Sequence, residues 1–263
     1  MNATNMQQRV NKVRAYAEHA REEIQEALFL LAALEPLTRD QKILAPLNQT
    51  HAAHTLNLLQ WTLFRTATID LCSGVLDKDE RSGSLKALID MLEGTDLVSA
   101  IRAERTRPLP SGNRPASLDP ASWAAMEREH QESERNQAQA EFDEALPKLR
   151  AGFKELSEGE LATRLWDVRR KILAHGNVVF EDGQYRGSRP EDFGLKWGDA
   201  EEFAAHAAAL IERVFVTLYG HHLSLDESKK ILAEYSDDFW KYLRAGLDAA
   251  PKRYDGSVKE RPR

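Results

Sequence analysis

The chain has 263 residues, of which 42% are hydrophobic and 30% are charged. That length suffices for one large domain or two small ones with a sizeable buried core. The formal net charge of −6 disfavours a protein that coats nucleic acid, because such proteins usually present a basic face, but it leaves room for a local basic cleft. The sequence contains 14 glycines and 10 prolines, and residues that favour helices dominate it, so we predict an all-α fold.

Cys72 is the only cysteine of the sequence, which excludes an intramolecular disulfide and suits a reducing compartment. It lies in an apolar stretch, so we interpret it as a small buried hydrophobe and not as a nucleophile. The first residues lack the apolar core of a signal peptide, and no stretch approaches the roughly 18 apolar residues of a membrane span. We therefore expect a cytoplasmic protein without a membrane partner.

Apolar residues at alternating three- and four-residue steps predict a first helix that Pro36 closes. The stripe has the spacing of a coiled-coil seam and is expected to pack within the core or against a partner chain. It consists of Val10, Val13, Ala17, Ala20, Ile24, Ala27, Leu31 and Leu34. A second helix is expected over about 49–76 and, because its apolar residues point in several directions, in the centre of the fold.

A polar turn over 77–84 and short helices around 85–92 and 96–105 are expected next, followed by a loop over 108–118. A long helix then begins with Asp119 as N-cap and Pro120 at the first helical position. Its segment 127–137 has no apolar face, which indicates that this segment either projects into solvent or is frayed.

Another helix is expected over about 158–175, with Gly176 as its stop. Two β-like runs around Asp182 and Gly183 then predict one short β-hairpin. Two amphipathic helices follow, of which the second carries Ile231, Tyr235, Phe239, Tyr242 and Leu243. We expect a single helical domain over 5–248 and a disordered tail over 249–263.

Several large functional classes lack their motifs in this sequence. We find no Gly-rich phosphate loop, no dinucleotide fingerprint, no cysteine-based zinc site and no G-x-S-x-G nucleophile turn. We therefore expect neither a cofactor nor a metal.

The most informative stretch is LWDVRRKILAHGN, residues 165–177, which places Arg169, Arg170 and Lys171 just before His175. On an ideal α-helix Arg170 lies about 140° from His175 around the axis, so the two side chains would flank a cleft that a second helix completes. Histidine exchanges protons near neutral pH, and arginine offers a fixed fork of donors to phosphate oxygens. Together they suit RNA cleavage without metal, in which the RNA 2′-hydroxyl attacks phosphorus.

Arg170, four intervening residues and His175 match the Arg–x4–6–His signature of HEPN domains (higher eukaryotes and prokaryotes nucleotide-binding). The stretch RRKILAHGN resembles the branch of this family linked to abortive phage infection. Residues 75–92, VLDKDERSGSLKALIDML, resemble the loop-and-helix segment of that branch.

The resemblance implies an HEPN-like bundle of long helices that forms a homodimer with its motif helices face to face. The Arg170 and His175 side chains of both chains then form one composite, metal-independent endoribonuclease site. Arg169, Lys171 and Asn177 are supporting or RNA-binding candidates. Lys171 departs from the family, in which the residue after the arginine is commonly Asn, His or Asp. The implied role is a toxin in phage defence or in a toxin–antitoxin system, with RNA as substrate and an antitoxin or defence component as partner.

Other functions stay open at this stage. A non-catalytic helical interaction protein, binding a protein or nucleotide partner, would keep Arg170 and His175 as structural residues. Nucleotide transfer has no motif to support it. Arg65 and Asp70 support the cleft, form a structural ion pair or are simply exposed, and the arginines of 102–114 are either RNA contacts or solvated loop residues.

Overall fold

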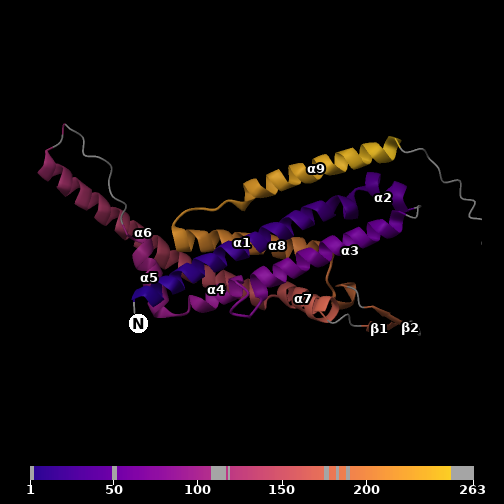
Figure 1. Cartoon of the computed structure of the whole chain (residues 1–263), viewed down its shortest axis with the longest axis horizontal. Helices are drawn as coiled ribbons and strands as arrows, with labels where there is room; N and C mark the ends of the chain where they lie inside the picture. Colours follow the sequence, from indigo (N-terminus) through magenta and orange to yellow (C-terminus); the bar gives the residue numbers. More distant parts are fainter. Residues whose placement is uncertain are drawn as a thin grey trace, which may run out of the picture.

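The computed structural model describes residues 3–48, 52–107, 117, 119–174, 178–181, 184–187 and 190–249. These residues form an elongated bundle of helices, which confirms the all-α prediction (Figure 1). The long helices are α1 (Ala3–Arg39), α3 (Ala52–Leu71), α6 (Pro120–Glu158), α8 (Trp197–Tyr219) and α9 (Leu225–Ala249). The shorter elements are α2 (Gln41–Asn48), α4 (Leu85–Met91), α5 (Thr95–Arg105), α7 (Glu160–Val168), two π-helical turns, η1 (Cys72–Leu76) and η2 (Arg169–Ala174), and a 3-10 turn, η3 (Pro190–Phe193).

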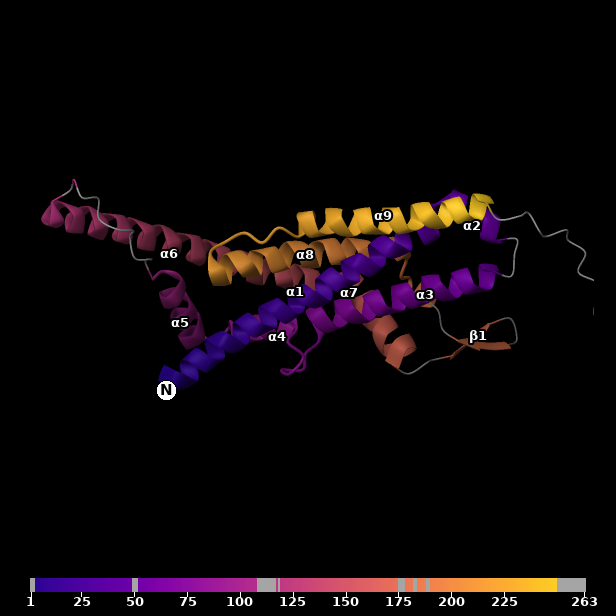
Figure 2. The same ribbon diagram turned by 45° about the horizontal axis from the view of Figure 1, so that its top comes forward.

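The seam of α1 forms the axis of the core. Every residue of the predicted stripe is buried, with exposed fractions of 4% or less. Helix α1 packs against α3, α8 and α9, and Figure 2 shows it crossing between α3 and the pair formed by α8 and α9. The seam therefore packs within the protein's own core, one of the two arrangements that its spacing allows.

The prediction that Pro36 ends the first helix is wrong, because α1 continues to Arg39. Proline has no backbone N–H, so the carbonyl of Ala32, four residues earlier, lacks its helical donor. The hydroxyl of Ser236 on α9 donates a hydrogen bond to that carbonyl at 3.2 Å. This bond replaces the missing one and stabilises the helix on both sides of the proline.

The helix predicted over 49–76 corresponds to α3 and η1, and the short α2 before them has no counterpart among the predicted helices. Phe64 is 1% exposed and packs edge-on against Trp197 of α8, with ring centroids 4.6 Å apart. Leu58 and Leu59 are 62% and 42% exposed, so the prediction that this helix is buried on all sides is wrong. Cys72 is fully buried, as predicted, and burial raises the pKa of its thiol to about 12.

Helix α6 begins as the sequence predicts. The carboxylate of Asp119 accepts hydrogen bonds from the backbone N–H groups of Ala121 at 3.2 Å and Ser122 at 2.8 Å, and Pro120 is the first helical residue. No residue over 120–141 is buried. Figure 1 shows this half of α6 extending past the ends of the other helices.

Two strands follow η2 in the segment where the sequence predicts a hairpin. Val178–Glu181 (β1) pairs antiparallel with Gln184–Gly187 (β2), and Val178 lies opposite Gly187. Asp182 and Gly183, on which the prediction depends, lie outside the described residues, as does the predicted disordered tail from residue 250 onward.

Helix α9 turns most of its large apolar side chains away from the bundle. Tyr235, Phe239 and Tyr242 are 66%, 61% and 77% exposed. Its inner face carries Trp240, which is 3% exposed and packs against Leu37 and its neighbours on α2 and α3. The predicted helix is present, but its apolar spacing does not mark the buried face. Among the described residues, no helix combines the length and the apolar content that crossing a bilayer requires.

Asp70 on α3 faces two carboxylates of α1. Burial, followed by the negative charges of Glu23 and Glu26, raises the pKa of Asp70 from the ordinary 3.8 to about 6. Its buried Oδ2 accepts no hydrogen bond from the described residues, and Arg65 forms no ion pair with it there. The structural ion pair considered for Arg65 and Asp70 is therefore wrong.

The shifted pKa of Asp70 makes a prediction about stability against pH. Between about pH 4 and pH 6 the folded state keeps a proton that the unfolded chain has lost, so the free energy of unfolding falls as pH rises through this window. We expect Asp70→Asn to raise the free energy of unfolding by about 1 kcal/mol at pH 7 and to leave it unchanged near pH 4, after allowance for solvent screening. Urea denaturation across this range measures the effect, and an equal gain at every pH would contradict it.

Candidate functional site

The motif segment starts on α7, which is anchored through one face. Ala162, Leu165 and Val168 recur every three residues on this helix and are all buried. Their burial fixes the rotation of α7 about its axis, because a helix with one apolar stripe has only one way to face the core. The polar residues between them are left at the surface.

The α-helix predicted to continue to residue 175 is wrong over Arg169–Ala174, which form the π-helical turn η2. In a π-helix the backbone hydrogen bonds join residues five apart, whereas in an α-helix they join residues four apart. The angle of about 140° between Arg170 and the residue five positions later was calculated for an α-helix and does not apply to this turn. Isolated π-helical turns are frequent at functional sites.

Arg170 is exposed and weakly held. Its side chain is 59% exposed, and its guanidinium lies 3.4 Å from Oδ1 of Asp167. Lys171 binds the other oxygen of the same carboxylate at 2.8 Å, and its ammonium lies 5.0 Å from the ring centroid of Phe193. The carboxylate of Asp167 thus forms ion pairs with two cations. Exposed ion pairs contribute little, so the Arg170 guanidinium can exchange Asp167 for a phosphate at small cost.

Arg169 is engaged on the other side of the turn. Its guanidinium lies 3.2 Å from Oδ2 of Asp77 and 4.8 Å from the ring centroid of Trp166. Asp77 is the first residue after η1, so one ion pair joins the ends of two π-helical turns that are far apart in the sequence. The side chains of both partners are less than a third exposed, which protects the pair from screening.

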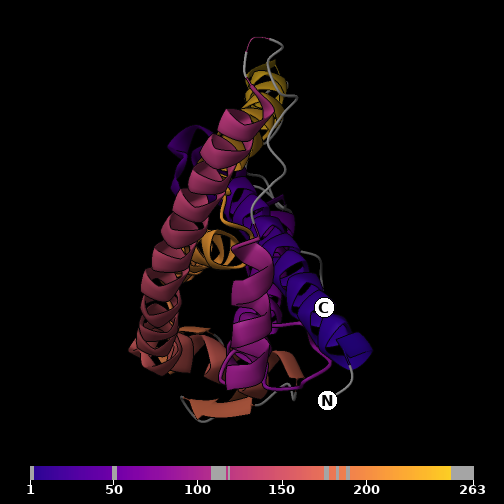
Figure 3. The same ribbon diagram turned by 90° about the vertical axis from the view of Figure 1, so that its left-hand side faces the viewer.

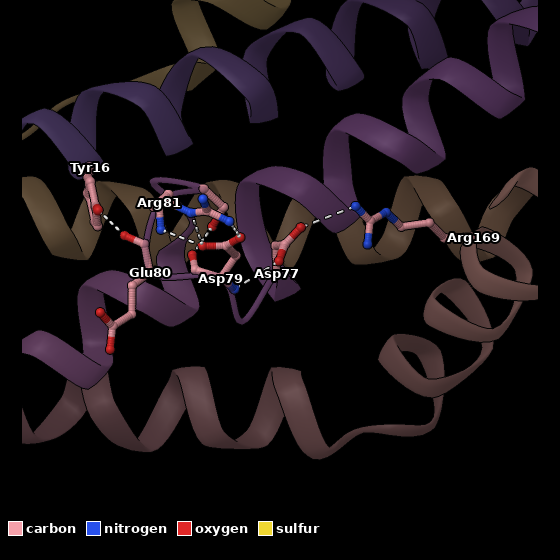
Figure 4. A network of polar contacts seen from close by, with 7 residues as sticks. Tyr16, Asp77, Asp79, Glu80, Arg81 and Arg169 are labelled. Atoms are coloured by element: carbon pink, nitrogen blue, oxygen red, sulfur yellow. Dashed lines mark hydrogen bonds and ion pairs between the residues drawn. The ribbon is translucent and has the colours of Figure 1, made fainter.

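The loop that carries Asp77 is itself tightly bonded, as Figure 4 shows. Tyr16 of α1 donates a hydrogen bond to the carbonyl of Glu80, and Arg81 binds Asp79 at 2.9 Å and lowers the pKa of that carboxyl to about 2. Ser84 accepts from the N–H of Ala87, capping α4, and donates to the carbonyl of Asp77. The loop expected as a simple polar turn therefore holds Asp77 in place for Arg169.

The ion pair between Asp77 and Arg169 can be measured directly. We expect a double-mutant cycle of Asp77→Ala and Arg169→Ala to give a coupling energy of about 1 kcal/mol in the free energy of unfolding, because the pair is partly buried. Urea denaturation of the four proteins provides the values. Independent, additive effects of the two substitutions would mean that the contact adds nothing to stability.

The structure brings Arg169, Arg170 and Lys171 together on η2. His175 and Asn177 lie outside the described residues, so their roles remain predictions. The four-residue spacing of Asp167 and Lys171 predicts an ion pair on the surface of the helix, and the structure contains this pair at 2.8 Å. Sequence reasoning missed Asp77, because nothing local links it to Arg169.

Comparisons with known proteins identify the family of the chain. A family model described as AbiU2, of the HEPN type linked to abortive infection, matches residues 11–239. Neither the curated proteins nor the solved structures give a significant match. Because the family match spans most of the sequence, including both η1 and the motif segment, the chain belongs to the AbiU2 family of HEPN domains.

Proposed function

We propose that the protein is a metal-independent endoribonuclease that acts as a homodimer, with Arg170 and His175 of both chains in one composite site. The observation that carries this proposal is the state of Arg170. Its guanidinium is largely exposed, its contact among the described residues is a long one to Asp167, and it stands on a π-helical turn, a feature that is frequent at functional sites.

The proposed chemistry uses groups of the substrate and of the protein. The 2′-hydroxyl of the RNA attacks the adjacent phosphorus, forms a 2′,3′-cyclic phosphate and releases the 5′-hydroxyl of the next nucleotide. His175 transfers a proton between these oxygens, and Arg170 stabilises the negative charge that develops on the phosphate. Arg170 has to leave Asp167 for this role, which the exposed contact permits.

The neighbouring cations have different proposed roles. Lys171, whose ammonium is shared between Asp167 and the Phe193 ring, would contact a flanking phosphate. Arg169 is a positioning residue, because Asp77 and Trp166 already occupy its guanidinium. Asn177 remains an RNA-binding candidate. In this setting the protein acts as a toxin in phage defence or in a toxin–antitoxin system, and an antitoxin or defence component controls it.

Cleavage of labelled structured RNA in excess EDTA, by the wild type and by His175→Ala, tests the proposal. We expect the wild type to cut and the variant to lose activity by about 100-fold or more. Products should end in 2′,3′-cyclic phosphate, and RNA with 2′-O-methyl groups should resist. Equal cutting by both proteins, or no cutting of several RNAs by the wild type, would refute the Arg170–His175 site.

A non-catalytic interaction protein is the second candidate, and one observation favours it. Helix α9 exposes a row of large apolar side chains, namely Ile231, Tyr235, Phe239, Tyr242 and Leu243. Monomeric proteins rarely leave such a row uncovered, so it marks a surface that contacts another molecule. This candidate is favoured over the nuclease if the wild type binds a protein partner but cuts no RNA.

A further inference from the structure

A second basic site lies between α5 and the projecting helix α6, away from the motif turn. Figure 3 shows these two helices side by side at one end of the bundle, whereas Figure 1 places β1 and β2, which follow the motif turn, at the other end. Two hollows of ≈ 400 and ≈ 340 Å³ open here, and both are lined by Thr106, Arg107 and Arg135. Hollows of this size fit small ligands or parts of larger ones.

Two arginines of α5 join this helix to α6 beside the site. Arg102 binds Asp143 of α6 through two hydrogen bonds of 2.8 and 2.5 Å. The side chain of Arg105 is 3% exposed, and it donates to the carbonyl of Ala138 at 2.6 Å and to Glu141 at 3.1 Å. Both side chains hold α5 against α6 and thereby fix the two helices that border the site.

The other two arginines are free for a ligand. Arg107 and Arg135 are exposed, and their side chains form no hydrogen bond or ion pair with any residue that the structure describes. They come from the two opposite walls and both line both hollows. Two unpaired guanidinium groups facing one space repel each other, and an anion between them removes that repulsion.

The composition of the larger hollow indicates which anion fits. Besides its arginines it is lined by Ser99, Ala103, Thr106 and Gln139, and none of the described residues that line it is acidic. Guanidinium and hydroxyl donors at this density match the oxygens of a phosphate. The smaller hollow differs, because Glu134, Gln137 and Tyr219 line it and offer acceptors and an aromatic ring. The carboxylate of Glu134 would repel a polyanion in that hollow. The amino groups of a base can instead donate hydrogen bonds to these acceptors, and its ring can contact the aromatic ring.

We propose that these paired hollows bind one ribonucleotide, with its phosphate between Arg107 and Arg135 and its base towards Tyr219. The nucleotide is either free or part of an RNA strand, since both present the same phosphate. The site does not depend on cleavage at Arg170 and His175, and it would give the projecting helix a function in ligand capture.

The binding affinity for two probes tests this site, with full-length protein throughout. The probes are fluorescent 5′-AMP and a short 2′-O-methyl RNA, which lacks the 2′-hydroxyl needed for cleavage. The test variant is Arg107→Gln/Arg135→Gln. The control is Arg128→Gln/Lys148→Gln, which removes two exposed charges of α6 that line neither hollow. Thermal melts check that each protein folds.

We expect the test variant to weaken binding of at least one probe about tenfold and the control to change it less than about twofold. If the RNA strand is the ligand, its salt dependence should also become shallower by about 0.7 in log–log slope for each phosphate that the variant no longer binds. Binding of 5′-AMP alone would assign a free nucleotide. The variant Arg107→Lys/Arg135→Lys should recover part of the affinity, because it keeps the charges.

Three results would overturn the site. The first is equal loss in the test and control variants, which would indicate general charge and no defined pocket. The second is the absence of binding of either probe by the wild type up to millimolar concentration. The third is tighter binding of a poly-glutamate peptide through the same arginines, which would make the surface a docking site for an acidic protein. Because no probe can be cleaved, these outcomes are independent of the proposed nuclease activity.

Discussion

Arg170→Ala is expected to lower metal-free RNA cleavage by about 100- to 1,000-fold, the loss typical when a main stabiliser of transition-state charge is removed. The reason lies in the contacts of this side chain: it is 59% exposed, and among the described residues it pairs with Asp167 alone, at 3.4 Å, so its removal should disturb the packing little. The fold should therefore survive while activity is lost. Single-turnover cleavage in excess EDTA, together with a thermal melt, measures both.

Two further variants make the result specific. Arg170→Lys keeps the positive charge but loses the planar fork, so we expect an intermediate loss of about tenfold. Arg128→Ala removes an exposed arginine of α6 that belongs neither to the motif turn nor to the loop that supports it, so it should leave cleavage unchanged. Activity of Arg170→Ala within about twofold of the wild type would remove this arginine from the mechanism, whatever His175→Ala does.

Phe64→Ala is expected to lower the free energy of unfolding by about 3–5 kcal/mol, the usual cost of replacing a fully buried aromatic residue by alanine. The ring is 1% exposed and stands edge-on to Trp197, so its loss leaves a cavity between α3 and α8 and removes an aromatic pair. Urea denaturation gives the value. Leu58→Ala is the matched control, because this leucine of the same helix is 62% exposed and should change stability by less than about 0.5 kcal/mol.

A loss below about 1 kcal/mol for Phe64→Ala, or similar losses for both variants, would mean that α3 and α8 do not pack as described. The comparison of the two residues also tests a point on which sequence reasoning failed. Both lie in an apolar stretch that suggested a central, buried helix, and tertiary packing distinguishes them, because Phe64 belongs to the main core cluster and Leu58 does not.

The helices could be predicted from the sequence wherever a periodic apolar stripe packs against another part of the same chain. The seam of α1 and the start of α6 at Asp119 follow from residue spacing and capping chemistry, which act locally. The family and the candidate arginine could also be predicted, because the motif is contiguous. These features need no knowledge of distant residues.

The remaining features depend on contacts between distant residues. The π-helical turn η2 begins at Arg169, whose partner Asp77 lies 92 residues earlier, and no local pattern encodes that pair. The orientation of α9 could not be predicted from the sequence either, because its most apolar stripe is exposed and its buried face carries Ser236 and Trp240. A periodicity shows that a helix has two faces but does not say which face another molecule covers.

The hydrogen bond from Ser236 to Ala32 has a consequence for synthesis of the chain on the ribosome. The two residues are 204 positions apart, as are Arg244 and Asp40, which form an ion pair near the same end of α1. The nascent chain therefore carries an incomplete turn at Pro36 until α9 emerges, and the Leu37 cluster lacks Trp240 until then. Domains generally fold as units after most of their contacts are available. We expect a truncated chain ending before α9 to be more sensitive to proteolysis at the end of α1, because native structure there is completed only after α9 has been synthesised.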